Sequence, residues 1–107
     1  MKNLALVRRY ARGLVGALAD EAEFRAVLDG LRDVQAVLAG HPEFRAVMAS
    51  PILSKRKKAG VLRAVIDRSG LPAKAARLVF LLLEHERLSL LGDIVAAAPE
   101  LWNERQG

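Results

Sequence analysis

Single glycines and prolines divide this chain into stretches that are rich in Ala, Leu, Arg, Glu and Lys, and this pattern limits the fold more than any other feature. These residue types have high helix propensity, whereas the alternation of apolar and polar residues typical of strands is nearly absent. The connections between the stretches are short, which favours antiparallel neighbours. A chain of 107 residues is the size of one domain. The sequence therefore predicts an all-α fold, a compact helical bundle.

Start and stop signals along the chain place the helix boundaries. Asp20, with a glutamate three residues later, forms a capping box, and Ser54 is a suitable N-cap. Gly70 is a stop signal, and Pro72 is well placed in the first turn of the next helix. The polar EHER segment at 84–87 contains no glycine or proline, so local signals allow either one long last helix or two. The predicted helices run over about 4–19, 21–38, 42–48, 55–69 and 72–98.

Composition and charge exclude several protein classes. The apolar content of 52% excludes a disordered tail, and the absence of cysteine excludes a disulfide framework and a thiol nucleophile. The longest apolar run, LVFLLL at 78–83, is far too short to span a bilayer. Charged residues interrupt every N-terminal stretch that could form a signal-peptide core. We therefore expect a soluble cytoplasmic protein.

Residue patterns typical of catalysis or of cofactor binding are missing from the sequence. His41 and His85 have no metal-ligand spacing with each other or with a carboxylate cluster, and they are most simply a cap and a surface residue near a helix end. The glycines are scattered singly and form no phosphate-binding loop. The acidic residues occur at caps and on solvated faces. We expect no catalytic residues, no metal and no cofactor.

The first predicted helix has a wider apolar surface than a bundle core requires. At 100 degrees per residue, one row suits the core and comprises Leu4, Val7, Ala11, Leu14, Val15 and Leu18. A second row lies beside it and comprises Leu6, Tyr10, Gly13 and Ala17. Together the rows cover roughly 200 degrees, about twice the arc that a core-facing helix needs. Tyr10 is also typical of a core edge with its hydroxyl in water.

The helix predicted from residue 72 has the same surplus of apolar residues. If its core-facing residues are Ala75, Val79, Leu82 and Leu83, then Leu78, Phe80 and Leu81 lie on its flanks and outer side. One interpretation is a central helix that the bundle surrounds on all sides, as is usual for helices that are apolar all round. The other is a groove for an amphipathic partner helix, formed together with the first helix, where Gly13 and Ala17 would let a second backbone come close.

The basic cluster KRKK at 55–58, in a chain of net charge +5, suggests nucleic acid as a partner. It lies in the first turn of a helix, where the helix dipole disfavours cations. Four exposed charges that are simply solvated are the common alternative. Aromatic residues that could stack on bases are not interleaved with the cluster, so we expect no nucleic-acid binding.

Three segments resemble a known family in their order and spacing. They are VRRYARGL at 7–14, SPILSKRKK at 50–58 and LLLEHERLSLL at 81–91, and the Arg87-Leu88 pair followed by Leu91 and Ile94 is the best single marker. Together they resemble the N-terminal domain of the delta subunit of F-type ATP synthase, whose mitochondrial equivalent is the oligomycin sensitivity-conferring protein. The resemblance covers the whole chain.

The resemblance implies a six-helix bundle over 1–105 that performs no catalysis. In that family the domain lies on the catalytic head and holds the N-terminal helix of an alpha subunit between its first and fifth helices. A second domain, expected to be missing from this chain, binds the b subunits of the peripheral stalk. The implied location is peripheral, at the cytoplasmic face of the bacterial inner membrane, with contact to the membrane only through the complex. The implied partner-binding residues are Leu6, Tyr10, Gly13, Ala17, Leu78, Leu81, Leu82 and His85.

The chain departs from the family pattern at a few positions. Arg77 stands where the family often has asparagine, and Leu78 where it often has phenylalanine. Pro99 falls within the expected sixth helix, and we expect it to kink or divide that helix. Two other functions remain as alternatives: a generic adaptor for some other amphipathic helix, and a basic bundle that binds nucleic acid.

Overall fold

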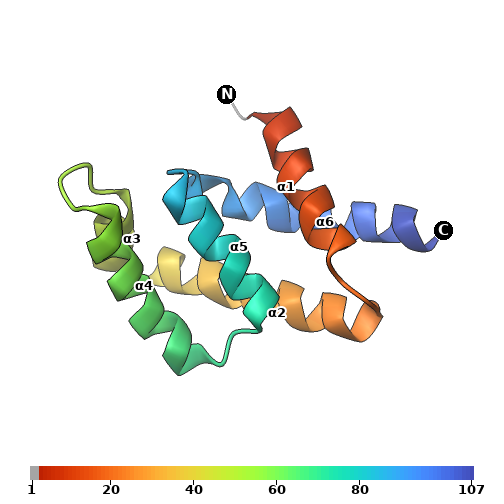
Figure 1. The fold of residues 1–107 in the computed structure, drawn as a ribbon, viewed down its shortest axis with the longest axis horizontal. Helices are drawn as coiled ribbons and strands as arrows, with labels where there is room; N and C mark the ends of the chain where they lie inside the picture. The colour runs from red at the N-terminus through yellow and green to blue at the C-terminus, as the bar shows by residue number, and fades with distance from the viewer. Residues whose placement is uncertain (1–2) are drawn as a thin grey trace.

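Six α-helices and one short 3-10 helix make up the computed structural model, which describes residues 3–107 (Figure 1). No strand occurs in this range, so the prediction of an all-α six-helix bundle is confirmed. In chain order the elements are α1 (Leu4–Gly16), α2 (Glu21–Gly40), α3 (Pro42–Ala49), α4 (Lys55–Ser69), α5 (Ala73–Glu84), η1 (Leu88–Leu90) and α6 (Leu91–Gln106).

Side-chain caps fix the starts of three helices. Asp20 Oδ1 and Ser54 Oγ each accept a hydrogen bond from the backbone N–H three residues later, at 2.9 and 3.2 Å. Both caps agree with the sequence prediction. Asn3 caps α1 in the same way, at 3.1 Å, although the sequence patterns considered above did not identify it. Gly70 ends α4 with a left-handed φ of 69°, which glycine adopts without steric cost.

The first helix is shorter than predicted. It ends at Gly16, because the N–H groups of Ala17 and Leu18 bond to carbonyls only three residues back, at 3.0 and 3.2 Å. Arg105 of α6 donates from Nη1 to the carbonyls of Val15 and Leu18. A charged side chain thus satisfies carbonyl groups that another helical turn would otherwise have used. The ends of α2 and α3 differ from the prediction by only one or two residues.

The EHER segment separates two helices, and this resolves the alternative that local signals left open. Glu86 has a left-handed φ of 58°, and the chain then passes through η1 into α6. The prediction that Pro99 kinks or divides the last helix is wrong as regards division, because α6 continues through it to Gln106. Ala98 and Trp102 are buried on either side of the proline, and this packing offsets the missing backbone hydrogen bond.

Packing of α1 against α6 brings the first and last helices together, while the two termini lie apart (Figure 1). The residues of α1 predicted for the core are buried, with one exception. Leu4 is 65% exposed, because the first turn of α1 projects beyond the rest of the bundle. Below this interface the rings of Phe24 and Trp102 stack in parallel with their centroids 4.8 Å apart. Such pairs stabilise a core beyond the area that they bury.

The fifth helix packs against α2, α4 and η1 and is not covered on all sides. Leu78, predicted for its flank, is buried, because it points toward the bundle interior beside Leu82. Phe80 is half-buried, and the guanidinium of Arg63 lies 4.3 Å from its ring centroid. Leu81 remains 39% exposed. The interpretation of a fully surrounded helix is therefore wrong.

Candidate partner-binding surface between α1 and α5

Two basic side chains tie α5 to α1, one near each end of α5. At the start of α5, Lys74 Nζ donates to the Ala17 carbonyl at 2.7 Å and to Glu23 Oε1 at 3.0 Å. Just beyond its end, Arg87 Nη1 donates to the Tyr10 hydroxyl at 2.9 Å. The first bridge lies at the C-terminal end of α1 and the second in its middle, so the two helices run antiparallel past each other (Figure 1).

The Lys74 bridge also involves the start of α2. The backbone N–H of Ala19 donates to Glu23 Oε1 at 2.7 Å, and the same oxygen accepts from Lys74. The hydrogen bond from Ala19 and, to a smaller extent, the one from Lys74 lower the pKa of Glu23. The carboxylate therefore stays ionised at neutral pH and holds α1, α2 and α5 together at this corner.

Six of the eight predicted partner-binding residues reach the surface on α1 and α5 at or near these bridges. Leu6 and Tyr10 are half-buried, whereas Gly13, Ala17, Leu81 and His85 are exposed. These six residues define the α1/α5 surface. The other two, Leu78 and Leu82, are 7% and 0% exposed, so they support it from below. The interpretation of Leu82 as a residue open to a partner does not agree with its burial, because its side chain faces the core.

The glycines on α1 have no packing role within the bundle. A Cβ atom added at Gly13 or Gly16 would meet no atom within 4 Å. At Gly30 of α2, by contrast, the added Cβ would lie 2.6 Å from Leu71 Cδ1, so close packing requires glycine there. An exposed glycine inside a helix costs roughly 0.5–1 kcal/mol relative to alanine. The bundle thus carries a cost on α1 that its own packing does not explain.

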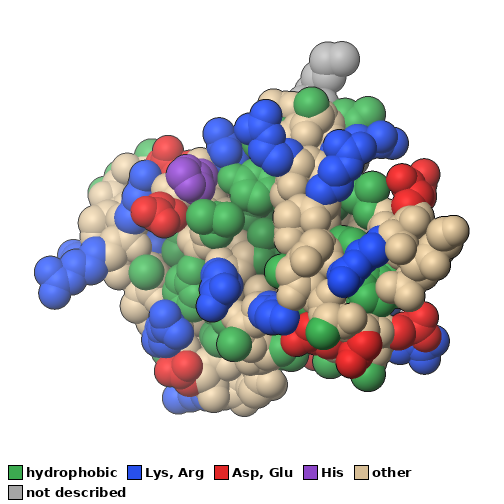
Figure 2. All heavy atoms as spheres, turned by 45° about the vertical axis from the view of Figure 1, so that its right-hand side comes forward, with side chains coloured by type: hydrophobic (Ala, Val, Ile, Leu, Met, Phe, Trp, Pro, Cys, Tyr) green, Lys and Arg blue, Asp and Glu red, His purple; other side chains and the backbone are tan. Residues whose placement is uncertain are grey.

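Basic side chains surround the α1/α5 surface. Arg9 on α1 and Arg77 on α5 are exposed beside it, and Lys74 and Arg87 lie at its two ends. Figure 2 shows hydrophobic side chains that reach one face of the molecule, with Lys and Arg on several sides of them and acidic side chains next to the histidine. An amphipathic helix with an apolar stripe and acidic flanks would match this arrangement in both shape and charge.

Other kinds of site find little support in residues 3–107. In this range no group of three or more His, Cys, Asp or Glu residues is placed to hold a metal ion. No helix of the described chain combines the length and the hydropathy that a bilayer crossing requires. The KRKK cluster does not form one basic face, since its first three residues are exposed but Lys58 is buried. The cluster therefore offers three exposed cations, and not four, to a phosphate backbone.

Comparison with known proteins assigns the chain to a family. A family model described as ATP synthase delta (OSCP) subunit matches residues 6–107. The chain belongs to this family. The match includes both helices of the α1/α5 surface and the Arg87 that ties them together.

Individual relatives of this delta/OSCP family member are similar over its whole length. ATP synthase subunit delta of Desulfatibacillum aliphaticivorans is 27% identical over all of this chain, which covers 58% of that relative. ATP synthase subunit delta 2 of Syntrophotalea carbinolica is 31% identical, with 60% of it covered. The chain thus spans about three-fifths of the length of these curated relatives. No solved structure matches it significantly.

The two basic bridges were not predicted from the sequence as parts of the site. No sequence pattern singles out Lys74, and Arg87 enters only as part of a family marker. Their partners lie 57 and 77 residues away along the chain, beyond the reach of any local pattern. The available signal was indirect: Arg87 ends the polar EHER segment at 84–87, which follows the apolar part of α5.

Proposed function

We propose that this chain is a non-catalytic stator component of F-type ATP synthase and that its α1/α5 surface binds the N-terminal helix of an alpha subunit. The observation that carries the proposal is an apolar, glycine-containing surface left open between two helices that side chains bridge at both ends. Membership of the delta/OSCP family supports the choice of partner.

The proposed role is mechanical. A rotary motor transmits torque only if its catalytic head is held against rotation, so the stator has to bind tightly and deform little. Apolar burial contributes roughly 25 cal/mol per Å² of area removed from water, from which the entropic cost of association is subtracted. The bridges at Lys74 and Arg87 fix α1 relative to α5 before binding, which reduces the cost of ordering the surface.

The glycines suit a closely packed partner helix. With no side chain at Gly13 or Gly16, the backbone of a docked helix can approach α1 more closely than a larger residue would allow. Ala17, at the end of the same row, is also small and exposed. The stability lost to exposed glycine in α1 would thus be recovered in the complex.

The curated relatives are longer than this chain, which leaves room in them for a second domain. About two-fifths of each curated relative lies outside the matched region. In the proposed arrangement residues 1–105 form the N-terminal domain of a delta subunit, and a C-terminal domain of the same subunit binds the b subunits of the peripheral stalk. The chain would then be peripheral, at the cytoplasmic face of the bacterial inner membrane, and would reach the membrane only through the complex.

A steric block on α1 tests the proposed surface. In Gly13→Trp the new side chain enters open space, so the bundle should fold normally while a docked helix is excluded. Isothermal titration calorimetry with a peptide of the alpha-subunit N-terminus should detect binding to the wild-type chain and none to this variant. Gly60→Trp is the matched control, because Gly60 of α4 also has no neighbour within 4 Å of an added Cβ.

The outcomes separate the competing functions. Unchanged affinity of Gly13→Trp for the peptide would show that the α1/α5 surface is the wrong site. If the wild-type chain folds but gives no heat with the peptide, the alpha subunit is the wrong partner and a generic helix adaptor becomes the better explanation. Binding of duplex DNA that weakens steeply with salt and is lost on neutralising 55–57 would instead favour the nucleic-acid alternative.

A further inference from the structure

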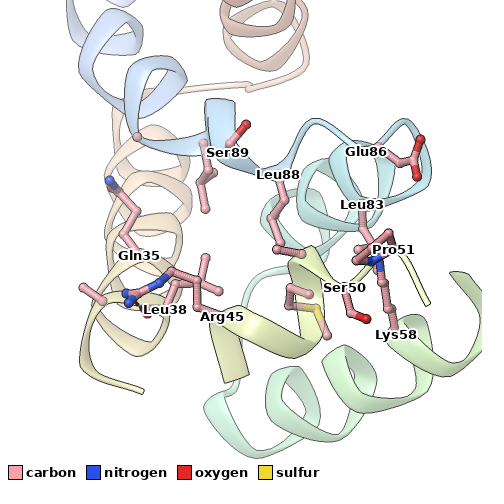
Figure 3. Close-up of a pocket in the computed structure, with 15 residues that line it drawn as sticks. Gln35, Leu38, Arg45, Ser50, Pro51, Lys58, Leu83, Glu86, Leu88 and Ser89 are labelled. Carbon is pink, nitrogen blue, oxygen red and sulfur yellow. Dashed lines mark hydrogen bonds between the residues drawn. The ribbon is translucent and has the colours of Figure 1, made fainter. Parts of the chain in front are cut away.

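A pocket of about 670 Å³ opens where α2, α3 and the η1 segment meet (Figure 3). We call it the α3 pocket. Its volume falls within the range of small-molecule sites in proteins, and such sites typically combine apolar walls with a few polar groups. None of the six residues of the α1/α5 surface lines it. The apolar side chains in its walls include Leu38, Met48, Leu83, Leu88 and Leu91.

Lys58 is the unusual residue of the α3 pocket. It is only 6% exposed and lines the pocket, whereas the three other basic residues of its cluster are exposed. Figure 3 shows its side chain extending from α4 toward Pro51 and Leu83. Within residues 3–107 its ammonium group makes no hydrogen bond or ion pair. The acidic residue of the lining, Glu86, is exposed, and its carboxylate points away from Lys58 in Figure 3.

Lys58 is buried mainly through its aliphatic stem, and its ammonium group makes no contact with a polar group of the described chain. The ammonium group is not fully buried, since Trp102 Nε1 is the only fully buried side-chain nitrogen or oxygen without a hydrogen-bond partner among the described residues. An anion placed in the α3 pocket would supply a polar contact in surroundings where water screens charges less than in bulk solvent. Ser50 lies in the same lining, and its Oγ accepts hydrogen bonds from the backbone N–H groups of Ile52 and Leu53 at 3.2 and 3.4 Å. Its own hydroxyl hydrogen remains available as a second donor to the anion.

The other groups of the α3 pocket restrict the kind of anion. Arg45 Nη1 donates to the Leu38 carbonyl at 3.1 Å and Arg45 is exposed at the rim, whereas Lys58 is the one buried basic residue of the lining, which suits a single negative charge inside the pocket. No aromatic residue lines the pocket to stack on a base, and no glycine-rich loop is present to hold a phosphate chain. Apolar walls beside one cation match an aliphatic tail that ends in a carboxylate.

We propose that the α3 pocket binds a free aliphatic monocarboxylate, with its carboxylate on Lys58 and its tail against the leucine side chains. The site is separate from the α1/α5 surface, so the proposal does not depend on the alpha-subunit partner. A small amphiphile could occupy it while a helix is bound to the α1/α5 surface.

Octanoate is a suitable probe, and methyl resonances of the leucines report its position. In a titration of the wild-type chain followed by 13C-methyl NMR, the methyl signals of Leu38, Leu83 and Leu88 should shift and saturate, while those of Leu6 and Leu81 should not. Lys58→Met keeps the apolar stem and removes the charge, so octanoate affinity should fall about tenfold or more. Lys57→Met is the matched control on the exposed neighbour and should leave the affinity unchanged.

Octanol separates recognition of the carboxylate from non-specific binding to apolar walls. It should bind Lys58→Met at least as well as it binds the wild-type chain. The proposal is overturned if octanoate shifts no methyl signal in the pocket, or if it binds Lys58→Met and the wild-type chain equally. If Lys58→Met does not fold, the wild-type titration decides the matter: shifts in the pocket that octanol reproduces at equal affinity contradict a role for the cation.

Discussion

The two sides of this bundle differ in whether their cations have partners within the chain. On the α1 side each bridging cation has a partner: Lys74 binds Ala17 and Glu23, Arg87 binds Tyr10, and Arg105 binds the carbonyls at the end of α1. On the α3 side the Lys58 residue is only 6% exposed, and its ammonium group has no hydrogen-bond or ion-pair partner within residues 3–107. The α1 side presents an open surface beside these bridges, whereas the α3 side contains a pocket of about 670 Å³.

This difference shows how one small bundle can offer two kinds of surface. The bridges on the α1 side leave few groups free to rearrange, which suits a surface that has to hold a partner under load. The α3 side has space and one unsatisfied charge, which suits a ligand that completes the site. Mutations on the two sides should therefore affect stability in opposite directions.

The largest effect should come from the stacked pair on the α1 side. Trp102→Ala removes a ring that is 2% exposed and stacked on Phe24, so we expect the free energy of unfolding in urea to fall by about 3–5 kcal/mol. Trp102→Phe keeps the stack and removes an indole N–H that lacks a hydrogen-bond partner among the described residues, so it should cost less than about 1.5 kcal/mol. Equal losses for both variants would contradict the importance of the stack.

Lys58→Met should act in the opposite direction and with a smaller effect. The substitution removes a charge that has no partner within residues 3–107 and places an apolar side chain of similar length against apolar walls. We expect the free energy of unfolding to rise by about 1 kcal/mol or to stay the same, since no contact of the ammonium group is lost and apolar area is buried. Lys57→Met, on the exposed neighbour, should change it by less than about 0.5 kcal/mol. A loss above that amount at Lys58 alone would show that its ammonium group is already well solvated.

The local signals in the sequence predicted most of the fold. Asp20, Ser54 and Gly70 act within a single turn of helix, so their roles follow from neighbouring residues and appear in the structure as expected. The row of Tyr10 and Gly13 was also recognisable, because the spacing of residues on a helix fixes which side chains share a face. These features depend on helix geometry alone.

The features that the sequence did not reveal depend on contacts between distant segments. α1 ends early partly because Arg105, far along the chain, binds its last carbonyls. Leu82 was placed in the core by helical spacing and on the partner surface by family resemblance, and its burial agrees with the spacing. Lys58 belongs to a basic run that is typical of a solvated surface, and only the fold places it against the apolar side chains of the α3 pocket. No spacing rule identifies such residues, because their surroundings come from other helices.

The smallest expected effect concerns acid and the corner at Glu23. The lowered pKa of this carboxyl group means that its ionised form contributes stability above the pKa of the unfolded chain, and that the contribution is lost as pH falls through the folded pKa. Glu23→Gln should therefore lower the free energy of unfolding at neutral pH by a small amount, because the group is exposed to solvent. The difference from the wild-type chain should shrink as the pH is lowered below about 4, and it should disappear once the Glu23 carboxyl group is protonated in both the folded and the unfolded chain.

Urea unfolding between neutral pH and about pH 3 measures this difference in the free energy of unfolding, with Glu104→Gln on the exposed end of α6 as the control. A Glu23→Gln deficit that stays constant over this range would mean that the carboxylate charge contributes nothing, and that the corner depends on the Lys74 bond to the Ala17 carbonyl alone.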